Sequence, residues 1–271
     1  MGHDLLKGKR GIIFGALDSN SIAWKVAEKA HEEGAVFTLS NAPVAMRMGA
    51  INDLAAKTNS EVIGADATSI EDLENLMNKS MEVLGGKIDF ILHSIGMSLN
   101  VRKKNHYTAL NYDFYHKTLD ISSMSLHKTL QTAMKLDVMN EWGSVVALTY
   151  IAAQRVFPDY NEMADAKSLL ESITRSFGYH YGKAKNVRVN TISQSPTKTT
   201  AGSGVKGFNS FFNYAHAMSP LGNAPSENCA NYCISMFSDL TRMVTMQNLF
   251  HDGGFSFTGI SGDVMDKYED D

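Results

Sequence analysis

The chain contains few of the residues that stabilise small extracellular proteins. It has 2 cysteines and 5 prolines in 271 residues, so neither a disulfide framework nor a proline-rich linker organises it. Cys229 and Cys233 share one face of an expected helix, and no second pair of cysteines or histidines completes a zinc pattern. We therefore expect two buried free thiols, no metal site and a reducing compartment.

Long apolar runs and a surplus of positive charge are also missing. No apolar run approaches the ~20 residues that a membrane-spanning helix needs, and the short, charged start does not resemble a signal peptide. The net charge is −4 and no basic stripe stands out, which argues against nucleic acid as a partner. We expect a cytoplasmic protein that binds neither nucleic acid nor membrane.

Short apolar runs alternate with helical patterns over most of the chain. This alternation predicts an α/β fold in a single domain over residues 1–271, Rossmann-like and doubly wound, with about seven parallel strands and helices on both faces. Longer helices are expected at 113–136 and 161–181. The expected strands are 11–16, 35–40, 61–67, 87–96, 143–149, 186–193 and 245–254.

Five segments should meet at one edge of this sheet, where parallel strands end and where ligands bind in such folds. They contain Gly15, Asp66, Gly96, Tyr150 and Pro196. The convergence of separate segments is better support for a ligand site than any one motif.

The first turn could hold a pyrophosphate, because small residues lead from a strand into a helix that starts near Ser21. Only Gly15 remains of the usual glycine-rich fingerprint, so an ordinary strand–helix connection stays possible. Ser21 could instead cap the helix. Asp66 could accept a hydrogen bond from an adenine amino group or cap the helix that begins near Ser69. His93 stands in an apolar run and is expected to be a core residue.

Tyr150, Tyr160 and Lys167 surround an expected strand-to-helix junction. If Tyr160 and Lys167 both lie on the helix, they are two turns apart on one face, about 10 Å. A phenol can share a proton where negative charge develops on an oxygen, and an ammonium can hold hydroxyls and lower the pKa of the phenol. The alternative is that these residues are structural.

The segment 197–212 combines three glycines with three phenylalanines. Glycines that permit hinging and aromatic side chains that favour burial suggest a substrate-covering loop over an apolar pocket. A short surface helix packed on the core is the alternative.

With these residues in place, the chain resembles the short-chain dehydrogenase/reductases and, among them, the bacterial enoyl-acyl carrier protein reductases. Ordinary members carry a tyrosine four residues before the lysine and a serine thirteen residues before that tyrosine. Here Met163 and Tyr150 occupy those positions, and Tyr160 precedes Lys167 by seven residues. This double departure is typical of the enoyl reductases and argues against a ketoreductase or an alcohol dehydrogenase.

The resemblance implies the reaction and its partners. The expected reaction is the reduction of the trans-2 double bond of an enoyl thioester on acyl carrier protein, the last reductive step of the fatty acid elongation cycle. The cofactor is expected to be NADH, with NADPH possible, since Arg47 is the only basic candidate near the end of the second strand. A homotetramer is expected from the family alone.

The resemblance also assigns residues. Tyr160 is expected to stabilise the enolate oxygen, Lys167 to hold the nicotinamide ribose, and Tyr150 to line the site and help in protonation. The expected cofactor-binding residues are Gly15, Ser21, Ile22, Asp66, Ala67, Ser94, Ile95, Gly96, Lys167 and Thr197. The expected substrate-binding residues are Met97, Ser98, Tyr150, Tyr160, Met163 and Phe208.

The chain also departs from the usual family pattern after the sixth expected strand. Gln194 and Ser195 stand where the family has alanine and glycine, and Thr197 replaces a common isoleucine. All three lie where the nicotinamide carboxamide should bind. Two alternatives therefore stay open: a short-chain reductase for another conjugated or carbonyl substrate, and a dinucleotide-binding paralogue without turnover.

Overall fold

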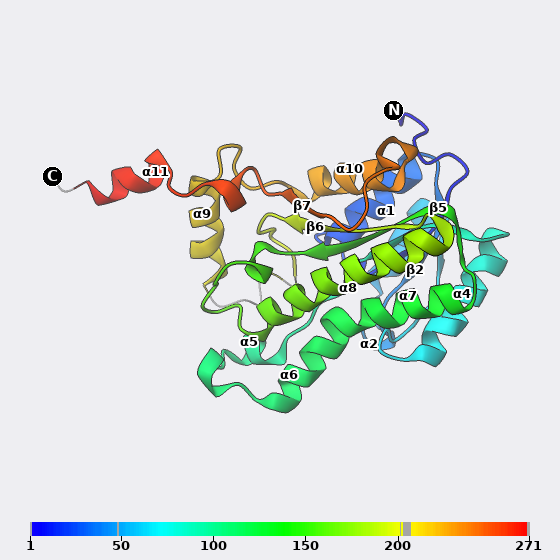
Figure 1. Ribbon diagram of the computed structural model, residues 1–271, viewed down its shortest axis with the longest axis horizontal. Coiled ribbons are helices and arrows are strands. Elements are labelled where there is room, and N and C mark those ends of the chain that lie inside the picture. Colours follow the sequence, from blue (N-terminus) through cyan, green and yellow to red (C-terminus); the bar gives the residue numbers. More distant parts are fainter. Residues whose placement is uncertain (1, 48, 201, 203–206, 270–271) are drawn as a thin grey trace.

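A parallel sheet is the centre of the computed structural model, which describes residues 2–47, 49–200, 202 and 207–269. Seven strands lie in the order β3-β2-β1-β4-β5-β6-β7, and every neighbouring pair is parallel (Figure 1). The strands are β1 (Arg10–Phe14), β2 (Val36–Ser40), β3 (Glu61–Val62), β4 (Ile88–His93), β5 (Met139–Thr149), β6 (Arg188–Gln194) and β7 (Asn248–His251). The predicted architecture is confirmed.

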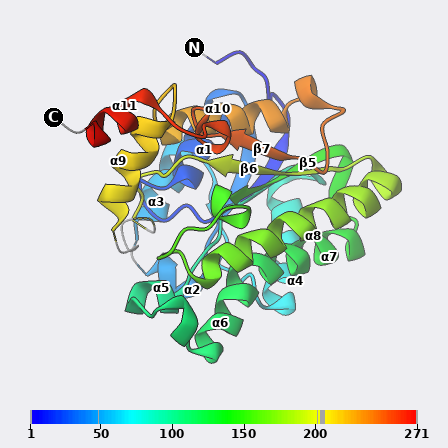
Figure 2. The ribbon, with the colours of Figure 1, turned by 60° about the vertical axis from the view of Figure 1, so that its left-hand side comes forward.

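Helices cover both faces of the sheet (Figure 2). The cluster on one face includes α1, α3 and α10, and the cluster on the other includes α4, α7 and α8. The helices are α1 (Ile22–Glu32), α2 (Pro43–Met46), α3 (Ala50–Thr58), α4 (Ile70–Leu84), α5 (Leu99–Lys103), α6 (Tyr112–Leu119), α7 (Ser125–Lys135), α8 (Glu162–Lys185), α9 (Phe208–Met218), α10 (Ser226–Phe237) and α11 (Gly262–Met265).

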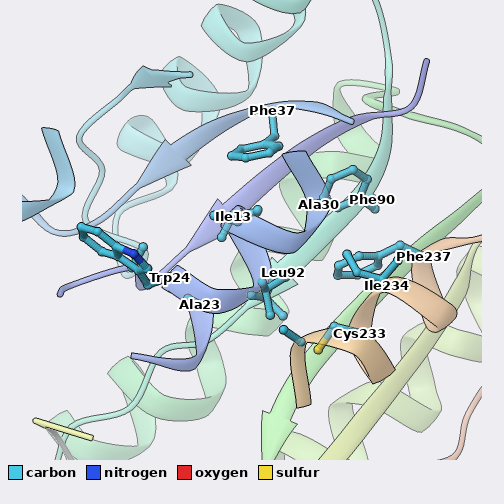
Figure 3. Packing of buried hydrophobic residues seen from close by; sticks show 14 of the residues in the cluster. Ile13, Ala23, Trp24, Ala30, Phe37, Phe90, Leu92, Cys233, Ile234 and Phe237 are labelled. Carbon is cyan, nitrogen blue, oxygen red and sulfur yellow. The ribbon is translucent and has the colours of Figure 1, made fainter. Parts of the chain in front are cut away.

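Alternation along the strands produces two apolar layers. In β1, Ile12 and Phe14 join the cluster under α4, α7 and α8, whereas Ile13 joins the cluster under α1 and α10. Successive side chains of a strand point to opposite faces, so a strand buried on both sides reads as a continuous apolar run. Phe90 stacks on Phe237 with ring centroids 4.6 Å apart and links β4 to α10 (Figure 3).

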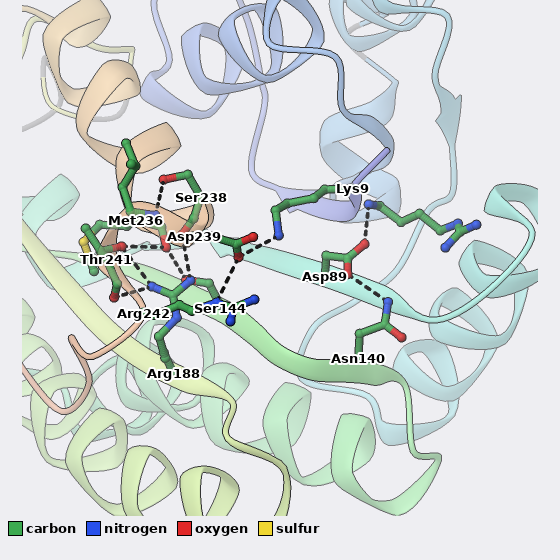
Figure 4. A network of polar contacts seen from close by, with 12 residues as sticks. Lys9, Asp89, Asn140, Ser144, Arg188, Met236, Ser238, Asp239, Thr241 and Arg242 are labelled. Atoms are coloured by element: carbon green, nitrogen blue, oxygen red, sulfur yellow. Dashed lines mark hydrogen bonds and ion pairs between the residues drawn. The ribbon is translucent and has the colours of Figure 1, made fainter. Parts of the chain in front are cut away.

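Polar residues tie the amino ends of the strands together, at the edge opposite the expected site (Figure 4). Arg188 at the start of β6 donates to the carbonyl oxygens of Thr241 at 2.9 Å and Ser238 at 3.1 Å. Asp89 near the start of β4 accepts from the Arg10 amide and from Asn140 Nδ2, both at 2.8 Å. These bonds satisfy polar groups at the strand starts and join neighbouring strands there.

Several expected elements have other bounds in the structure. The seventh strand, expected over 245–254, is Asn248–His251, and the fifth, expected over 143–149, begins at Met139. The third strand is only two residues long, because just Glu61 and Val62 pair with β2. The helix expected over 113–136 is interrupted by a π-helical turn at Asp120–Met124 between α6 and α7. The helix expected over 161–181 is α8, which continues to Lys185. In the described part of the chain, we find no helix with the length and apolar character needed to span a bilayer.

Candidate active site

The first strand ends between β2 and β4, where the strand order reverses. In folds of this kind, ligands bind in the crevice at this point, beyond the carboxyl ends of β1 and β4. Gly15 has φ +92°, and a Cβ atom there would lie 2.0 Å from the Ser94 carbonyl oxygen. Only glycine combines this left-handed conformation with so close an approach. Gly15 and Ser94, both predicted to bind the cofactor, therefore lie side by side at the crevice.

Ser21 immediately precedes α1, but its side chain does not cap the helix. Its hydroxyl donates to the Asp18 carbonyl at 2.7 Å and accepts from the Leu17 amide at 3.3 Å. The capping alternative for the Ser21 side chain is therefore wrong. The start of α1, with Ile22 as its first residue, keeps its positive dipole end directed at the crevice edge without a side-chain cap.

A hollow lies beside Gly15, at the ends of β1, β2 and β4. Asp66 at its edge accepts from the Thr68 amide at 2.9 Å and the Thr68 hydroxyl at 2.7 Å. Ser69 caps α4 by accepting from the Asp72 amide at 3.2 Å, so the prediction that Asp66 could cap this helix is wrong. The hollow is lined by Phe14, Gly15, Ser40, Asn41, Ala42, Ala65, Asp66, Ala67, Thr68, Ile95 and Ile121. A largely apolar hollow with one carboxylate fits a flat ring that carries an amino group.

Lys167 is buried in α8 and directs its ammonium at the carboxyl end of β5. Its Nζ donates to the Leu148 carbonyl at 2.8 Å, and this is its one hydrogen bond in the described part of the chain. Burial lowers the pKa of Lys167 to about 8, although the nearby Glu171 favours the charged form. A Cβ atom on Gly96 would lie 3.8 Å from Nζ and from the Met163 methyl, so Gly96, Met163 and Lys167 are brought together.

The neighbouring Glu171 is held by hydrogen bonds from three elements. It accepts from Thr149 Oγ1 at 3.0 Å, from Gln154 Nε2 at 3.1 Å and from Asn248 Nδ2 at 3.1 Å. Burial raises the pKa of Glu171. This carboxyl therefore fixes α8 against β5 and β7 and influences Lys167 through its field.

Tyr150 and Tyr160 face each other at the start of α8. Their ring centroids are 5.3 Å apart, at an angle of 58°. The Tyr150 hydroxyl is buried and lacks a partner within the described residues, and no described residue bonds the Tyr160 hydroxyl. Burial raises the pKa of both phenols, and the proximity of Tyr160 raises that of Tyr150 further. Both groups therefore stay protonated and can donate.

Tyr160 lies outside α8, so the condition that Tyr160 and Lys167 share one helix is not met. The helix begins at Glu162 with Asn161 as its N-cap, at φ 48° and ψ −141°. The chain therefore bends sharply between Tyr160 and the helix, and this bend turns the phenol toward Tyr150. The helical distance of about 10 Å between Tyr160 and Lys167 does not apply.

His93 is a core residue, as predicted. Its ring is completely buried, with Nε2 2.8 Å from Ser125 Oγ. Burial lowers its pKa to about 3, with a smaller contribution from Lys167, so the imidazole is neutral. Cys229 and Cys233 are buried free thiols of α10, also as predicted.

Met97 and Ser98 continue from β4 into α5 and are held by hydrogen bonds within the protein. The Met97 amide donates to Ser122 Oγ at 3.0 Å. Ser98 caps α5 by accepting from the Val101 amide at 3.0 Å, and donates to Glu162 at 2.5 Å. The Ser98 hydroxyl is therefore not a free donor for a thioester.

The three departures after β6 form one polar cluster with His251. Gln194 Nε2 donates to the Ala224 carbonyl at 2.8 Å and to Thr197 Oγ1 at 3.3 Å. Its Oε1 lies 2.6 Å from His251 Nδ1, and Ser195 Oγ accepts from the Ala224 amide at 2.9 Å. Gln194 and Ser195 thus have structural partners that alanine and glycine would lack.

The predicted segment 197–212 is described only in part, because residues 201 and 203–206 lie outside the described residues. Phe208–Met218 form α9, as the surface-helix alternative expects. The aromatic side chain of α9 that contacts Tyr150 is Phe211, at 5.9 Å between centroids, whereas Phe208 packs on Phe212. Asp18 accepts from Thr200 Oγ1 at 2.5 Å, which links this segment to the Gly15 turn.

Sequence reasoning included Phe211 only as part of the 197–212 segment, and it missed Phe157 and Glu162. Phe157 and Phe211 pack against Tyr150, with centroids 5.3 and 5.9 Å away. Glu162 is completely buried beside Ser98. The sequence signals that could have indicated them were an aromatic residue just before Tyr160 and a carboxylate between Tyr160 and Met163.

Known proteins resemble this chain over almost its entire length. The sequence model of a family described as "Enoyl-(Acyl carrier protein) reductase" matches residues 15–256. The chain belongs to this family. Enoyl-[acyl-carrier-protein] reductase [NADH] 2 of Rhizobium meliloti is 33% identical over 260 residues, which cover 94% of each chain. The enzyme named FabI of Bacillus subtilis is 30% identical over 93% of this chain and 98% of its own.

A solved structure of an enoyl-acyl carrier protein reductase superimposes closely on this chain. The FabI–NADH complex from Alistipes finegoldii gives a TM-score of 0.97 at 62% identity, covering 98% of this chain and 94% of its own. The family predicted from Tyr150, Tyr160 and Lys167 is confirmed, and with it the activity of an oxidoreductase of fatty acid synthesis.

Proposed function

We propose that this enoyl-acyl carrier protein reductase reduces the trans-2 double bond of enoyl thioesters with NADH, and that Tyr160 stabilises the oxygen on which negative charge develops. The observation that supports the proposal is that two adjacent phenols without hydrogen-bond partners among the described residues precede α8, whose Lys167 holds its ammonium at the carboxyl end of β5. NADH is the cofactor in the names of the similar Rhizobium and Rickettsia enzymes.

The side chains around the crevice fit a nicotinamide dinucleotide. An ammonium has three N–H donors, and that of Lys167 uses one, for Leu148. The other two could hold the adjacent hydroxyls of a ribose. The start of α1, which follows the Gly15 turn, could receive a pyrophosphate, and the hollow at Asp66 and Ala67 could receive a ring. When bound, NADH supplies the hydride.

Tyr160 is the proposed donor to the enolate oxygen. Its hydroxyl has no partner among the described residues, and burial raises its pKa, so the proton stays on the phenol until charge develops nearby. A donor aimed at an oxygen that becomes negative stabilises the transition state more than the ground state. Lys167 keeps the site positive.

Tyr150 lines the site and supports Tyr160 rather than replacing it. Its ring packs against Phe157 and Phe211 as well as Tyr160, which fixes the orientation of Tyr160. Met97 and Met163 are proposed to contact the acyl chain together with Phe208. Thr197 is proposed to contact the nicotinamide carboxamide.

The deciding experiment is a spectrophotometric assay with crotonyl and longer enoyl thioesters and each reduced nicotinamide cofactor. We expect oxidation of NADH that depends on the enoyl thioester. Oxidation with ketones alone would indicate another short-chain reductase. Cofactor binding without turnover on any of these substrates would indicate a dinucleotide-binding protein without catalysis.

We further propose that the enzyme is a cytoplasmic homotetramer. Large apolar side chains with more than half of their surface exposed lie on both sides of β7 in the sequence, and exposed apolar side chains are typical of subunit interfaces. They include Leu240, Met243, Phe257, Ile260 and Tyr268. Sedimentation of the purified protein measures the assembly directly, and a monomer at micromolar concentration would contradict it.

A further inference from the structure

Glu162 is a completely buried carboxyl in the first turn of α8, two residues after Tyr160. No ion pair of Glu162 is found in the described part of the chain. Burying a carboxylate is costly unless hydrogen bonds replace its hydration, and the start of a helix compensates only part of this cost. A residue retained at such a cost needs an explanation that core packing alone does not give.

Oε1 of Glu162 accepts three hydrogen bonds from two other elements. Ser98 Oγ donates at 2.5 Å and Asn100 Nδ2 at 3.2 Å, while Thr118 Oγ1, at 2.9 Å, shares its single proton between Glu162 and the Phe114 carbonyl at 2.8 Å. Oε2 is buried and has no partner within the described residues. One oxygen of Glu162 therefore joins α8 to the start of α5 and to α6.

The segment held in this way is the one that follows β4 at the predicted thioester. Asn100 continues the network, because its Oδ1 accepts from Asn105 Nδ2 at 2.6 Å and from the Asn111 amide at 3.0 Å. Asn161, the neighbour of Glu162, donates from Nδ2 to the Asn105 carbonyl at 2.7 Å. The first turn of α8 thus fixes both ends of residues 98–105.

We propose that Glu162 is a positioning residue that sets the separation between Tyr160 and the 97–98 segment, and hence the width of the slot for the acyl thioester. Tyr160 and Met163 pack with Val101 of α5 in one cluster, so a shift of α5 changes the walls of this slot. Glu162 itself touches neither substrate nor cofactor. The inference rests on the proposed function, in which Tyr160 and Met97 face the thioester.

The test compares Glu162→Leu, which removes the acceptor, with Glu162→Gln, which keeps Oε1. In Glu162→Leu we expect KM for an enoyl thioester to rise tenfold or more, while NADH affinity changes less than twofold. Glu162→Gln should stay within about threefold of the parent in both, because the amide oxygen still accepts. Ile173→Ala, which opens a cavity in the same helix away from this network, controls for a general loss of stability.

Amide hydrogen exchange provides a readout that does not depend on turnover. Exchange in residues 98–105 should accelerate at least tenfold in Glu162→Leu but not in Ile173→Ala. If Glu162→Leu does not fold, Thr118→Val removes one of the three donors and should show a smaller change of the same kind. A parent enzyme without enoyl reduction would overturn the proposed function alone. Unchanged exchange and KM in Glu162→Leu, or a loss in Glu162→Gln as large as in Glu162→Leu, would overturn the inference about Glu162.

Discussion

Tyr150 and Tyr160 lie with ring centroids 5.3 Å apart, and neither hydroxyl has a hydrogen-bond partner among the described residues. A buried hydroxyl normally finds an acceptor, so the unpartnered Tyr150 hydroxyl is costly, and Tyr160 beside it is partly buried. Such a pair is understandable where a ligand completes the bonding. The surroundings of the two tyrosines also differ. Tyr150 is enclosed by aromatic rings, as expected for a residue that lines the site, whereas Tyr160, the proposed donor, lies at the bend before α8.

The first prediction concerns the Tyr160 hydroxyl. Tyr160→Phe should lower kcat by roughly a hundredfold, about 3 kcal/mol, because one donor to the enolate oxygen is lost. NADH affinity should stay near that of the parent, since the ring and its packing remain. Steady-state kinetics on one enoyl thioester, with separate cofactor titration, measures both quantities.

Tyr150→Phe is the matched control for this prediction. It removes the hydroxyl from the neighbouring ring, and we expect a smaller loss of kcat. A large loss in Tyr150→Phe combined with near-parental kcat in Tyr160→Phe would show that the two roles are reversed. If neither variant loses turnover, the phenols are structural.

The second prediction is an alkaline limit to activity set by Lys167, whose pKa is lowered to about 8. As pH rises through about 8, the free enzyme loses the ammonium charge, so kcat/KM should fall. Stability should change in the opposite direction. A lysine whose folded pKa lies below its ordinary value of 10.5 destabilises the fold while charged, and this penalty disappears as pH rises from about 8 to 10.5.

Thermal unfolding across the same pH range separates this effect from denaturation. Lys167→Met keeps the aliphatic part of the side chain without the charge, so NADH affinity and turnover should both be reduced. The fall of kcat/KM near pH 8 should also be absent in this variant. If kcat/KM of Lys167→Met still falls near pH 8, the fall is caused by the titration of another group. Parent-like binding and turnover in the variant would exclude Lys167 as the ribose anchor.

The third prediction concerns Gly15. Gly15→Ala should destabilise the protein by more than the ~1–2 kcal/mol of a left-handed alanine, because its Cβ would also meet the Ser94 carbonyl. NADH affinity should fall as well. Gly85→Ala is the matched control, since Gly85 has φ +71° and no atom within 4 Å of a new Cβ. Equal loss of stability in both variants would show that the contact with Ser94 yields easily.

The fourth prediction is a higher kcat/KM with NADH than with NADPH. Ser40 ends β2 and Asn41 follows it, and neither side chain is a cation. Asn41 donates to the Ala16 carbonyl and accepts from the Ala42 amide. Arg47 is exposed at the end of α2. If NADPH is preferred, Arg47→Ala should abolish the preference, and otherwise it should have little effect.

Local patterns were sufficient to predict most of the fold. The runs ending at Gly15, Gly96 and Tyr150 were correctly read as strands, because a strand buried on both faces is apolar throughout. The length of β3 was overestimated, because only Glu61 and Val62 are in strand register with β2. Beyond them, only the Ile63 and Ala65 amides donate, to the carbonyls of Leu39 and Asn41. The π-helical turn was missed because residues 120–124 are compatible with an ordinary helix.

The missed parts of the site depend on residues far apart in sequence. Glu162 acquires its role from Ser98 and Thr118, 64 and 44 residues away. Gln194 depends likewise on His251, 57 residues away. No local periodicity encodes such contacts. The bend at Asn161 could not be predicted from the sequence either. Its positive φ is imposed by tertiary contacts, and asparagine tolerates this conformation.

The two thiols of α10 allow the opening of the folded protein to be measured by alkylation. Cys229 and Cys233 are free thiols, fully buried between α10 and the sheet. The hydrogen bond between the two thiols, together with burial, raises the pKa of Cys233. A thiol reagent can therefore react only after α10 has moved away from α1 and β5. The rate of alkylation under native conditions would measure how often this layer opens, with no label introduced and no residue of the site disturbed.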